Sequence, residues 1–422
     1  MTKKSLLLIG VALVLAISVV RFVLVSPPGG GFLEEKDSGW WAVQSIDTVK
    51  YSRDLAREKI KDTSFDETIE LQIKRIAETG ATHVAIGTPY DEEFLPFLTR
   101  WVEAARRDDL KVWFRGNFSG WEGWFEYGKI GREEHLAKTR QFIVDNGGLF
   151  EDGDIFSSCT ECENGGPGDP RQTGDIDGHR RFLLEEHKVA KEAFRKIGKS
   201  VATNYNPMNG DVANAIMDTE TTKALGGIVA IDHYVASPDQ LAMDIKAIAR
   251  RSGGKVVLGE FGAPIPDIHG EFSERQQAQW LERALTATST IPELVGVNYW
   301  TGFGGSSKLW SSKGKARSAV SELTRFYTPK VLQGYLKNEL GRPIAGAKLS
   351  GNLKTTETGK NGEFYFPYVS KDIVLKVSAE GYLDKGLTNL DNESLVEVIM
   401  EKESESIIFE IQKFLYQLFT PK

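Results

Sequence analysis

Between residues 39 and 329 the chain alternates short apolar runs with longer amphipathic segments, and this alternation limits the possible folds more than any other feature. The apolar or β-branched runs lie at 40–47, 82–88, 111–117, 154–160, 200–206, 227–234, 255–261 and 294–300. The amphipathic segments include 66–80, 93–109, 132–147, 179–198, 237–253 and 273–288. Apolar residues recur in them at i, i+3, i+4 and i+7, as in helices packed on one face.

Eight strands that alternate with helices over about 290 residues predict an α/β fold of the (β/α)8 barrel type. An open, doubly wound sheet is the rival architecture. That fold would carry a glycine-rich phosphate-binding loop after its first strand, and none follows WWAVQSID at 40–47. The sequence therefore favours the barrel for residues 39–329.

The N-terminus carries a second strong signal. Lys3 and Lys4 precede SLLLIGVALVLAISVVRFVLV at 5–25, which is long enough for a membrane-spanning helix. The alternative is a cleaved signal peptide, but its apolar region is usually shorter and ends in a small-residue cleavage site. We expect a single-pass cell-membrane anchor at 1–25, with the bulk of the chain outside. Residues 26–38, rich in Pro and Gly and then charged, predict a flexible linker.

Composition and charge limit the classes of partner that the chain could bind. The chain has 422 residues, of which 41% are hydrophobic and 26% charged, so it is long and apolar enough for two or three globular domains. Its formal net charge is −7, and it has no long basic run. Phosphate backbones are bound by clustered Lys and Arg, so we expect no nucleic-acid partner.

From residue 330 the sequence pattern changes: apolar and polar residues alternate, and turn motifs such as GRP and KNG separate the runs. This pattern predicts a small all-β sandwich at 330–402. This stretch resembles the carboxypeptidase-regulatory-like domain in its G-x-P-I-x-G-A, T-G-x-N-G-x-F-x-F and A-E-G-Y segments. The resemblance implies an accessory module. Residues 403–422 predict an amphipathic helix, docked on the protein or resting on the membrane surface.

Polar residues gather where the expected barrel strands end, and barrel enzymes build their active sites there. Two of them, Glu161 and Glu260, follow the fourth and seventh strands. The others chosen as candidate substrate-binding residues are Arg115, Asn117, Asn204, Tyr205, His233, Tyr234 and Trp300. A carboxylate pair about 5–5.5 Å apart cleaves glycosidic bonds with retention, one acid protonating the leaving oxygen and the other attacking the anomeric carbon.

Four of these strand ends carry a family resemblance, among them strand 6 with Tyr234 and GVNYW of strand 8 with Trp300. VVLGEFGAP is similar to strand 7 of the clan A glycoside hydrolases, and DIFSSCTECEN resembles the strand that runs into their Asn-Glu-Pro motif. The resemblance implies Glu260 as nucleophile and Glu161 as acid/base. It also implies Tyr234 as a partner of the nucleophile and Trp300 as an aromatic floor under the sugar. Such enzymes need no metal or organic cofactor.

The chain departs from that motif next to the proposed acid. Thr160 stands where the family has Asn, and Cys162 stands where it has Pro, which leaves Glu163 as a second candidate acid. Cys159 and Cys162 could be half of a zinc site, a redox pair, a local disulfide or two free thiols. No second Cys pair exists, and the six histidines show no ligand spacing, so we expect no metal site.

The residues therefore predict an outward-facing retaining glycosidase that acts on a β-linked oligo- or polysaccharide. The alternative is a degenerate barrel that binds glycan at the cell surface without cutting it, which the irregular TEC segment favours. A transglycosylase with the same site is a third possibility.

Overall fold

The computed structural model describes residues 40–351, 354–369, 374–388 and 395–403, with three isolated positions at 412, 414 and 416. The expected anchor at 1–25 and linker at 26–38 lie outside these residues, and so does almost all of the helix expected at 403–422. Among the helices that the structure describes, none is long and apolar enough to cross a membrane.

Eight parallel strands form one sheet in the order β4-β3-β2-β1-β8-β7-β6-β5, which confirms the predicted α/β alternation. The strands are β1 (Val43–Asp47), β2 (His83–Ile86), β3 (Lys111–Phe114), β4 (Ile155–Phe156), β5 (Met208–Asn209), β6 (Ile228–Asp232), β7 (Lys255–Phe261) and β8 (Leu294–Tyr299). Adjacent strands pair in parallel register, as a chain of βαβ units requires.

The sheet closes where the fifth strand was expected, but in an irregular way. Ala202 bridges to Ile155 of β4, and the N–H of Phe156 donates to the Ala202 carbonyl at 2.8 Å. The regular ladder with β6 begins only at Met208. The prediction of a strand over 200–206 is therefore corrected to a bridging segment followed by a two-residue strand. Pro207 lies between the two and has no N–H to donate to a ladder.

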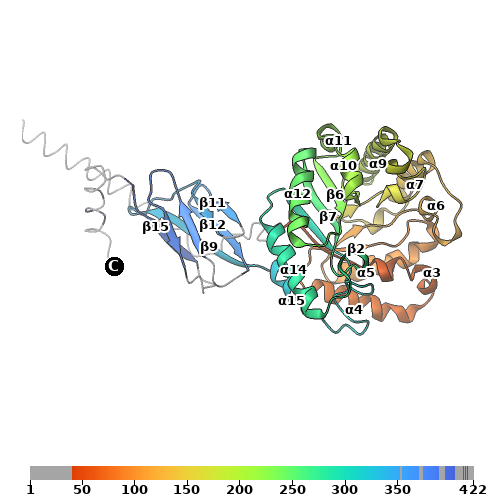
Figure 1. Cartoon of the computed structure of the whole chain (residues 1–422), viewed down its shortest axis with the longest axis horizontal. Coiled ribbons are helices and arrows are strands. Elements are labelled where there is room, and N and C mark those ends of the chain that lie inside the picture. The colour runs from red at the N-terminus through yellow and green to blue at the C-terminus, as the bar shows by residue number, and fades with distance from the viewer. Residues whose placement is uncertain are drawn as a thin grey trace, which may run out of the picture. The chain divides into compact units, whose positions relative to one another are not determined.

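Helices surround the sheet (Figure 1). The longer ones match the six predicted segments or follow them in the barrel order: α4 (Asp66–Ala77), α5 (Leu95–Arg107), α7 (Arg132–Asp145), α9 (Ile176–Lys196), α12 (Pro238–Ser252), α14 (Glu274–Ser289) and α15 (Ser318–Tyr327). Local sequence sets their ends. Ser273 and Gln276 form a reciprocal capping box at the start of α14, and Gly253 in the left-handed conformation ends α12.

Short helices occupy the connections. They are α2 (Val49–Ser52), α3 (Ala56–Lys59), α6 (Ser119–Glu122), α8 (Pro170–Thr173), α10 (Gly210–Ile216), α11 (Thr219–Ala224) and α13 (Pro266–His269). Single 3₁₀ turns lie at Thr63–Phe65, Glu92–Phe94, Trp124–Glu126, Gly147–Leu149 and Cys162–Asn164. Several of these elements follow strand ends and so bring side chains to the end of the barrel where the strands' carboxyl ends meet, called the mouth below.

The barrel interior is filled in layers, because alternate residues of each strand face inward. An apolar layer contains Val43, Ala85, Trp113, Ile155, Ala230 and Val257. Inward positions nearer the mouth are polar or charged, with Asp47 at the end of β1 and Arg115 directly after β3. The strands therefore deliver charged groups to the mouth above an apolar core.

A β-bulge in β7 sets the direction of one of these groups. Leu258 pairs with Ile231 and Glu260 pairs with Asp232, so Gly259 is an extra residue on β7. Strict alternation from the inward Val257 would turn Glu260 away from the interior. The bulge restores its inward direction, a common use of bulges beside functional sites.

The C-terminal residues form two antiparallel-rich sheets around one apolar cluster. The first has the order β11-β10-β13-β14 and the second β12-β9-β15. The strands are β9 (Lys330–Asn338), β10 (Lys348–Ser350), β11 (Thr355–Glu357), β12 (Glu363–Tyr368), β13 (Leu375–Ser378), β14 (Lys385–Leu387) and β15 (Val396–Met400). Side chains from both sheets, such as Leu336, Leu349, Phe366 and Val377, share this core. The small all-β region is thus present, and its likeness to the carboxypeptidase-regulatory-like domain stays a prediction.

We predict that Gly259→Ala destabilises the barrel. A Cβ at this position would lie 2.4 Å from Asp232 Oδ1 and 2.7 Å from Pro207 Cβ, so β7 would have to shift. Overpacking of this kind costs about 1–3 kcal/mol in the free energy of unfolding, measurable by urea denaturation. Gly128→Ala is the matched control, because nothing lies within 4 Å of its added Cβ. Equal stability of the two variants would contradict the bulge's packing role.

Candidate active site

Arg115 lies at the centre of the mouth, 5% exposed, among three carboxylates. Its Nη1 donates to Asp47 Oδ2 at 2.6 Å and to Glu260 Oε1 at 2.9 Å. Its Nη2 donates to Asp232 Oδ2 at 2.9 Å. Asn298 of β8 adds an amide N–H to Asp47 Oδ2 at 3.1 Å. These residues come from five different strands or strand ends and form one ionic group, called the Arg115 cluster below.

The charges of the Arg115 cluster do not balance, because one guanidinium faces three carboxylates. Burial opposes the charge of Arg115, yet Asp232, Glu260 and Asp47 raise its pKa well above the ordinary value. For Asp232, burial is the dominant cause and raises the pKa well above that of a free aspartate. The attraction of Arg115 opposes this rise. A buried group of this kind is stable only as a set, since removing one partner leaves uncompensated charge.

Glu260 is the member of the cluster with the most access to solvent, its side chain being 15% exposed. Its second oxygen, Oε2, accepts a hydrogen bond from the Tyr234 hydroxyl at 2.6 Å. Burial raises the pKa of Glu260 to about 7; Arg115 opposes this shift, and the charge of Glu161 adds to it. Both oxygens are therefore held in place by donors that favour the ionised form.

Trp300 directly follows β8 and contacts Tyr234, the residue that donates to Glu260. Its ring packs edge-on against Tyr234 with centroids 5.9 Å apart, and Lys50 Nζ lies 5.6 Å from the indole centroid. The ring is only partly buried. An indole placed in this way can cover the apolar face of a ring-shaped ligand.

Glu161 reaches the mouth from a loop, five positions beyond the end of β4. Cys159 and Cys162 form a disulfide around it, which confirms one of the four alternatives for this pair. The Glu161 backbone has φ +44°, in the left-handed region, and its N–H donates to the Pro207 carbonyl at 2.8 Å. Burial raises the pKa of Glu161, and the charge of Glu163 adds to the effect.

The charge of Glu161 acts on Glu260. It is among the causes that raise the pKa of Glu260, after burial and against the attraction of Arg115. The structure thus brings the two predicted catalytic residues to the same mouth; their chemical roles stay predictions.

Glu163, the second candidate acid, is 2% exposed and contacts Asn209, the last residue of β5. Its Oε1 accepts from the backbone N–H of Asn209 at 2.6 Å and from the Asn209 amide at 3.0 Å. Burial raises its pKa, and the Asn209 hydrogen bonds oppose that rise. These contacts favour Glu161 over Glu163 as the group that reaches a ligand.

Asn117 lies in a buried hydrogen-bond chain behind the mouth. Its Oδ1 faces His135 Nε2 at 2.9 Å, and the other ring nitrogen of His135 lies 2.8 Å from Glu186 Oε1. Its amide N–H donates to Glu122 Oε1 at 2.8 Å. The side chain is fully buried, so it orients Glu122 directly and would reach a ligand only through it.

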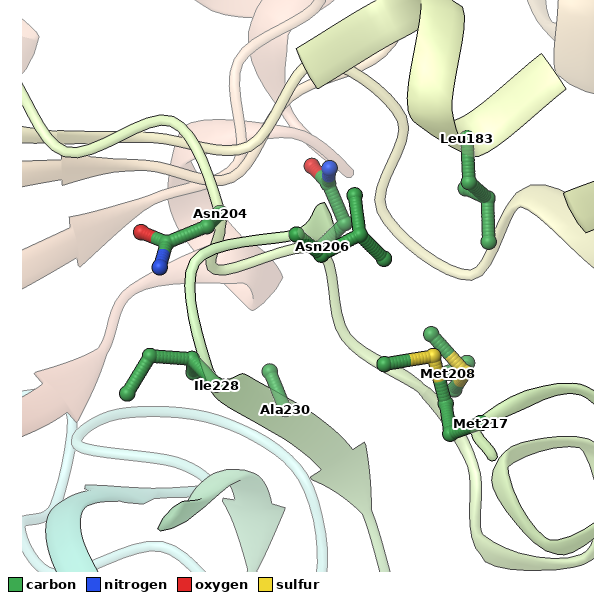
Figure 2. Close-up of a pocket in the computed structure, with 8 residues that line it drawn as sticks. Leu183, Asn204, Asn206, Met208, Met217, Ile228 and Ala230 are labelled. Carbon is green, nitrogen blue, oxygen red and sulfur yellow. The ribbon is translucent and has the colours of Figure 1, made fainter. Parts of the chain in front are cut away.

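Asn204, Tyr205 and His233 occupy other surroundings. Asn204 lines a small cavity with Asn206 and several apolar side chains, among them Leu183, Met208, Met217, Ile228 and Ala230 (Figure 2). Tyr205 packs edge-on against Trp113 inside the barrel, with centroids 5.8 Å apart. His233 Nε2 lies 2.8 Å from Asp244 Oδ2 on α12. Their expected role in substrate binding stays untested.

Three mouth carboxylates escaped the sequence-based selection. Asp47 ends β1 and Asp232 ends β6, so the strand-end rule that selected the other candidates could have found both. Glu122 lies on α6, and burial raises its pKa to about 7, with the charges of Glu161 and Glu163 adding to the rise. No sequence signal identifies Glu122, because its place depends on its hydrogen bond to Asn117.

Within the part of the chain that the structure describes, no group of three or more His, Cys, Asp or Glu side chains is arranged to hold a metal ion. The disulfide also removes both cysteines as zinc ligands. The chemical groups described at the mouth are carboxyls, the Arg115 guanidinium, the Tyr234 phenol, the Trp300 indole, the Lys50 ammonium and the Asn298 amide.

No protein-family model matches the chain, and no curated protein matches its sequence. Among solved structures, it is similar to an FMN-binding β-glucuronidase from Facaelibacterium prausnitzii L2-6, at 14% identity over 82% of this chain and 54% of that chain, with a TM-score of 0.44. It is also similar to a GH5_18 protein from Streptomyces cattleya in complex with GlcNAc, at 14% identity over 70% of this chain and 83% of that chain, with a TM-score of 0.49. The chain spans about half of the β-glucuronidase's own length. A function for this chain therefore has to be argued from the site.

We predict that Arg115→Met destabilises the protein by about 3–5 kcal/mol near pH 7, because three buried carboxylates lose their only shared cation. Arg115 lowers the pKa values of Asp232 and Glu260 in the folded protein, so losing this cation raises them. The loss of unfolding free energy relative to wild type should therefore shrink as the pH falls and the carboxyls become protonated. It should grow as the pH rises.

Urea denaturation at several pH values measures this effect. Arg325→Met is the matched control, because Arg325 pairs with Glu282 and Glu322 at a partly exposed site, where such pairs contribute about 1 kcal/mol or less. A pH-independent deficit in Arg115→Met, or one no larger than that of the control, would contradict the account.

Proposed function

We propose that this chain is a retaining glycoside hydrolase that acts on a β-linked oligo- or polysaccharide. The observation that carries the proposal is the setting of Glu260 at the mouth, where Arg115 and Tyr234 both donate to its carboxylate. The charge of Glu161 is one of the causes that raise the pKa of Glu260, so a second carboxyl acts on the same site. Trp300, which contacts Tyr234, supplies a stacking surface for a pyranose.

In the proposed reaction, the Glu260 carboxylate attacks the anomeric carbon while the bond to the leaving oxygen breaks. Glu161, as the carboxylic acid, gives its proton to that oxygen, so the leaving group departs as a neutral alcohol. Water then attacks the glycosyl ester, Glu161 takes up one proton from the water, and Glu260 leaves as a carboxylate. The net result is hydrolysis with retained configuration and both glutamates restored.

The hydrogen bonds support this division of roles. The guanidinium of Arg115 and the hydroxyl of Tyr234 both donate to Glu260, which favours its ionised form. Glu161 is partly buried and has the charge of Glu163 nearby, which favours its protonated form. While Glu161 keeps its proton, its charge no longer raises the pKa of Glu260. Protonated Glu161 thus favours ionised Glu260, which is the combination of states that the first step requires.

We further infer that the enzyme is held at the outer face of the cell membrane by residues 5–25. The support is the length and apolarity of this segment after Lys3 and Lys4. The Cys159–Cys162 disulfide fits an exported domain, because disulfides persist in oxidising compartments. A substrate outside the cell, such as a surface or environmental polysaccharide, follows from that placement.

We predict that Glu260→Gln lowers hydrolysis of the wild type's best aryl β-glycoside by more than about 10³-fold, because an amide cannot form the glycosyl ester. Glu271→Gln is the matched control, since Glu271 is an exposed residue eleven positions away. A panel of aryl β-glycosides and polysaccharides, assayed for released sugar, measures the effect.

The pH profile of the wild type completes this test. We expect kcat/KM to fall at acid pH as Glu260 is protonated, with a limb at or below its pKa of about 7, and to fall at alkaline pH as Glu161 loses its proton. Equal turnover by Glu260→Gln and wild type would contradict the mechanism. Glycan binding with no release of sugar by any form would instead support the non-catalytic alternative, and sugar transfer to acceptor glycans would support a transglycosylase.

A further inference from the structure

The loop that carries Glu161 is closed on itself by a covalent bond. Cys159 and Cys162 flank Thr160 and Glu161, and their disulfide joins Cα atoms 5.1 Å apart. Both cysteines are almost fully buried, at 0% and 2% exposure. Residues 159–162, called the disulfide loop below, therefore form a small ring in which Thr160 and Glu161 are the partly exposed members.

The disulfide loop is also fixed to the barrel on both sides. Before it, the backbone N–H of Ser158 donates to Asn206 Oδ1 at 3.0 Å. Within it, the N–H of Glu161 donates to the Pro207 carbonyl at 2.8 Å. At its end, the indole N–H of Trp121 donates to the Cys162 carbonyl at 3.2 Å. The ring is thus oriented as a unit relative to the mouth.

Glu161 needs such support more than Glu260 does. Glu260 lies within β7, and two side chains donate to its carboxylate. Glu161 lies beyond the end of β4, and its backbone is in the left-handed region at φ +44° and ψ +52°, which non-glycine residues rarely adopt. Such a conformation persists when the surrounding structure imposes it.

We propose that the Cys159–Cys162 disulfide is a positioning element for proton transfer by Glu161. The inference rests on the proposed glycosidase function. The ring holds the Glu161 backbone in its left-handed conformation, so that the carboxyl points to the leaving oxygen of the bound glycoside. The closed disulfide is then required for general acid/base catalysis, and far less for attack by Glu260.

The leaving group of the substrate separates these two roles. A phenyl β-glycoside has a poor leaving group and needs the proton from Glu161, while a 2,4-dinitrophenyl β-glycoside departs without it. Positioned general acids and bases contribute about 10²–10⁴-fold. We expect Cys159→Ala/Cys162→Ala to lose about 10–10²-fold in kcat/KM on the phenyl glycoside. On the dinitrophenyl glycoside, the loss should stay within about threefold, which also shows that the variant is folded.

Azide gives a second readout that a merely structural role would not move. Azide needs no general base: its nitrogen bonds to the anomeric carbon as the ester bond to Glu260 breaks, and the product is a β-glycosyl azide. We expect azide to accelerate turnover of the dinitrophenyl glycoside by Cys159→Ala/Cys162→Ala and by Glu161→Ala, and to leave the wild type unchanged. The glycosyl azide is identified by mass spectrometry.

If the double variant fails to fold, reduction of the Cys159–Cys162 disulfide in the wild-type protein tests the same role. A water-soluble phosphine supplies two electrons that break the S–S bond, water supplies two protons and the oxygen of the phosphine oxide, and alkylation counts the two thiols. The fraction of reduced protein should match the fraction of phenyl-glycosidase activity lost.

The outcomes are distinct. Unchanged activity without the disulfide, or equal losses on both glycosides without any glycosyl azide, would overturn the positioning role. If the wild type cleaves neither glycoside nor any polysaccharide of the panel, the proposed function fails, and the inference fails with it.

Discussion

The site depends on one buried guanidinium. Arg115 follows β3 and bonds to Asp47 of β1, Asp232 of β6 and Glu260 of β7, so its position ties the ends of four strands together. The same contacts hold one oxygen of Glu260 and favour its charge, while the surplus of carboxylates and their burial keep its pKa near 7. Stability and proposed reactivity therefore depend on the same cation, and neither can be changed without the other.

The two acids of the mouth are held by different means. Glu260 faces inward because Gly259 adds a bulge to β7, and Gly259 is required there since a Cβ would meet Asp232 and Pro207. Glu161 belongs to no strand, and a disulfide ring together with the Pro207 carbonyl fixes its backbone. Pro207 thus contacts both supports, and it also ends the irregular segment that closes the barrel. The least regular part of the sheet is the part that supports the site.

Much of this arrangement could be predicted from the sequence, because it follows from periodicity. Alternating patterns located the barrel strands, and the strand-end rule selected Arg115, Tyr234 and Glu260, which the structure brings into contact. The remainder depends on contacts that no periodicity encodes. Asn117 turns to His135 because α7 and α9 pack together, and Glu122 reaches the mouth only through Asn117. The shift of the fifth strand to Met208 reflects the missing donor of Pro207, which an apolar pattern does not register.

The central claim is that Glu260 forms a covalent bond to the sugar, and trapping that bond is its most direct test. A 2-deoxy-2-fluoro β-glycoside with a dinitrophenyl leaving group slows both steps, but the good leaving group lets the first proceed, so the glycosyl-enzyme accumulates. Tryptic digestion and fragmentation of residues 256–275 would locate the added mass. The account predicts one fluorosugar on Glu260, released by an acceptor glycan as activity returns. A label on Glu161, Glu163 or Glu122, or none on an enzyme that turns over its substrate, would contradict it.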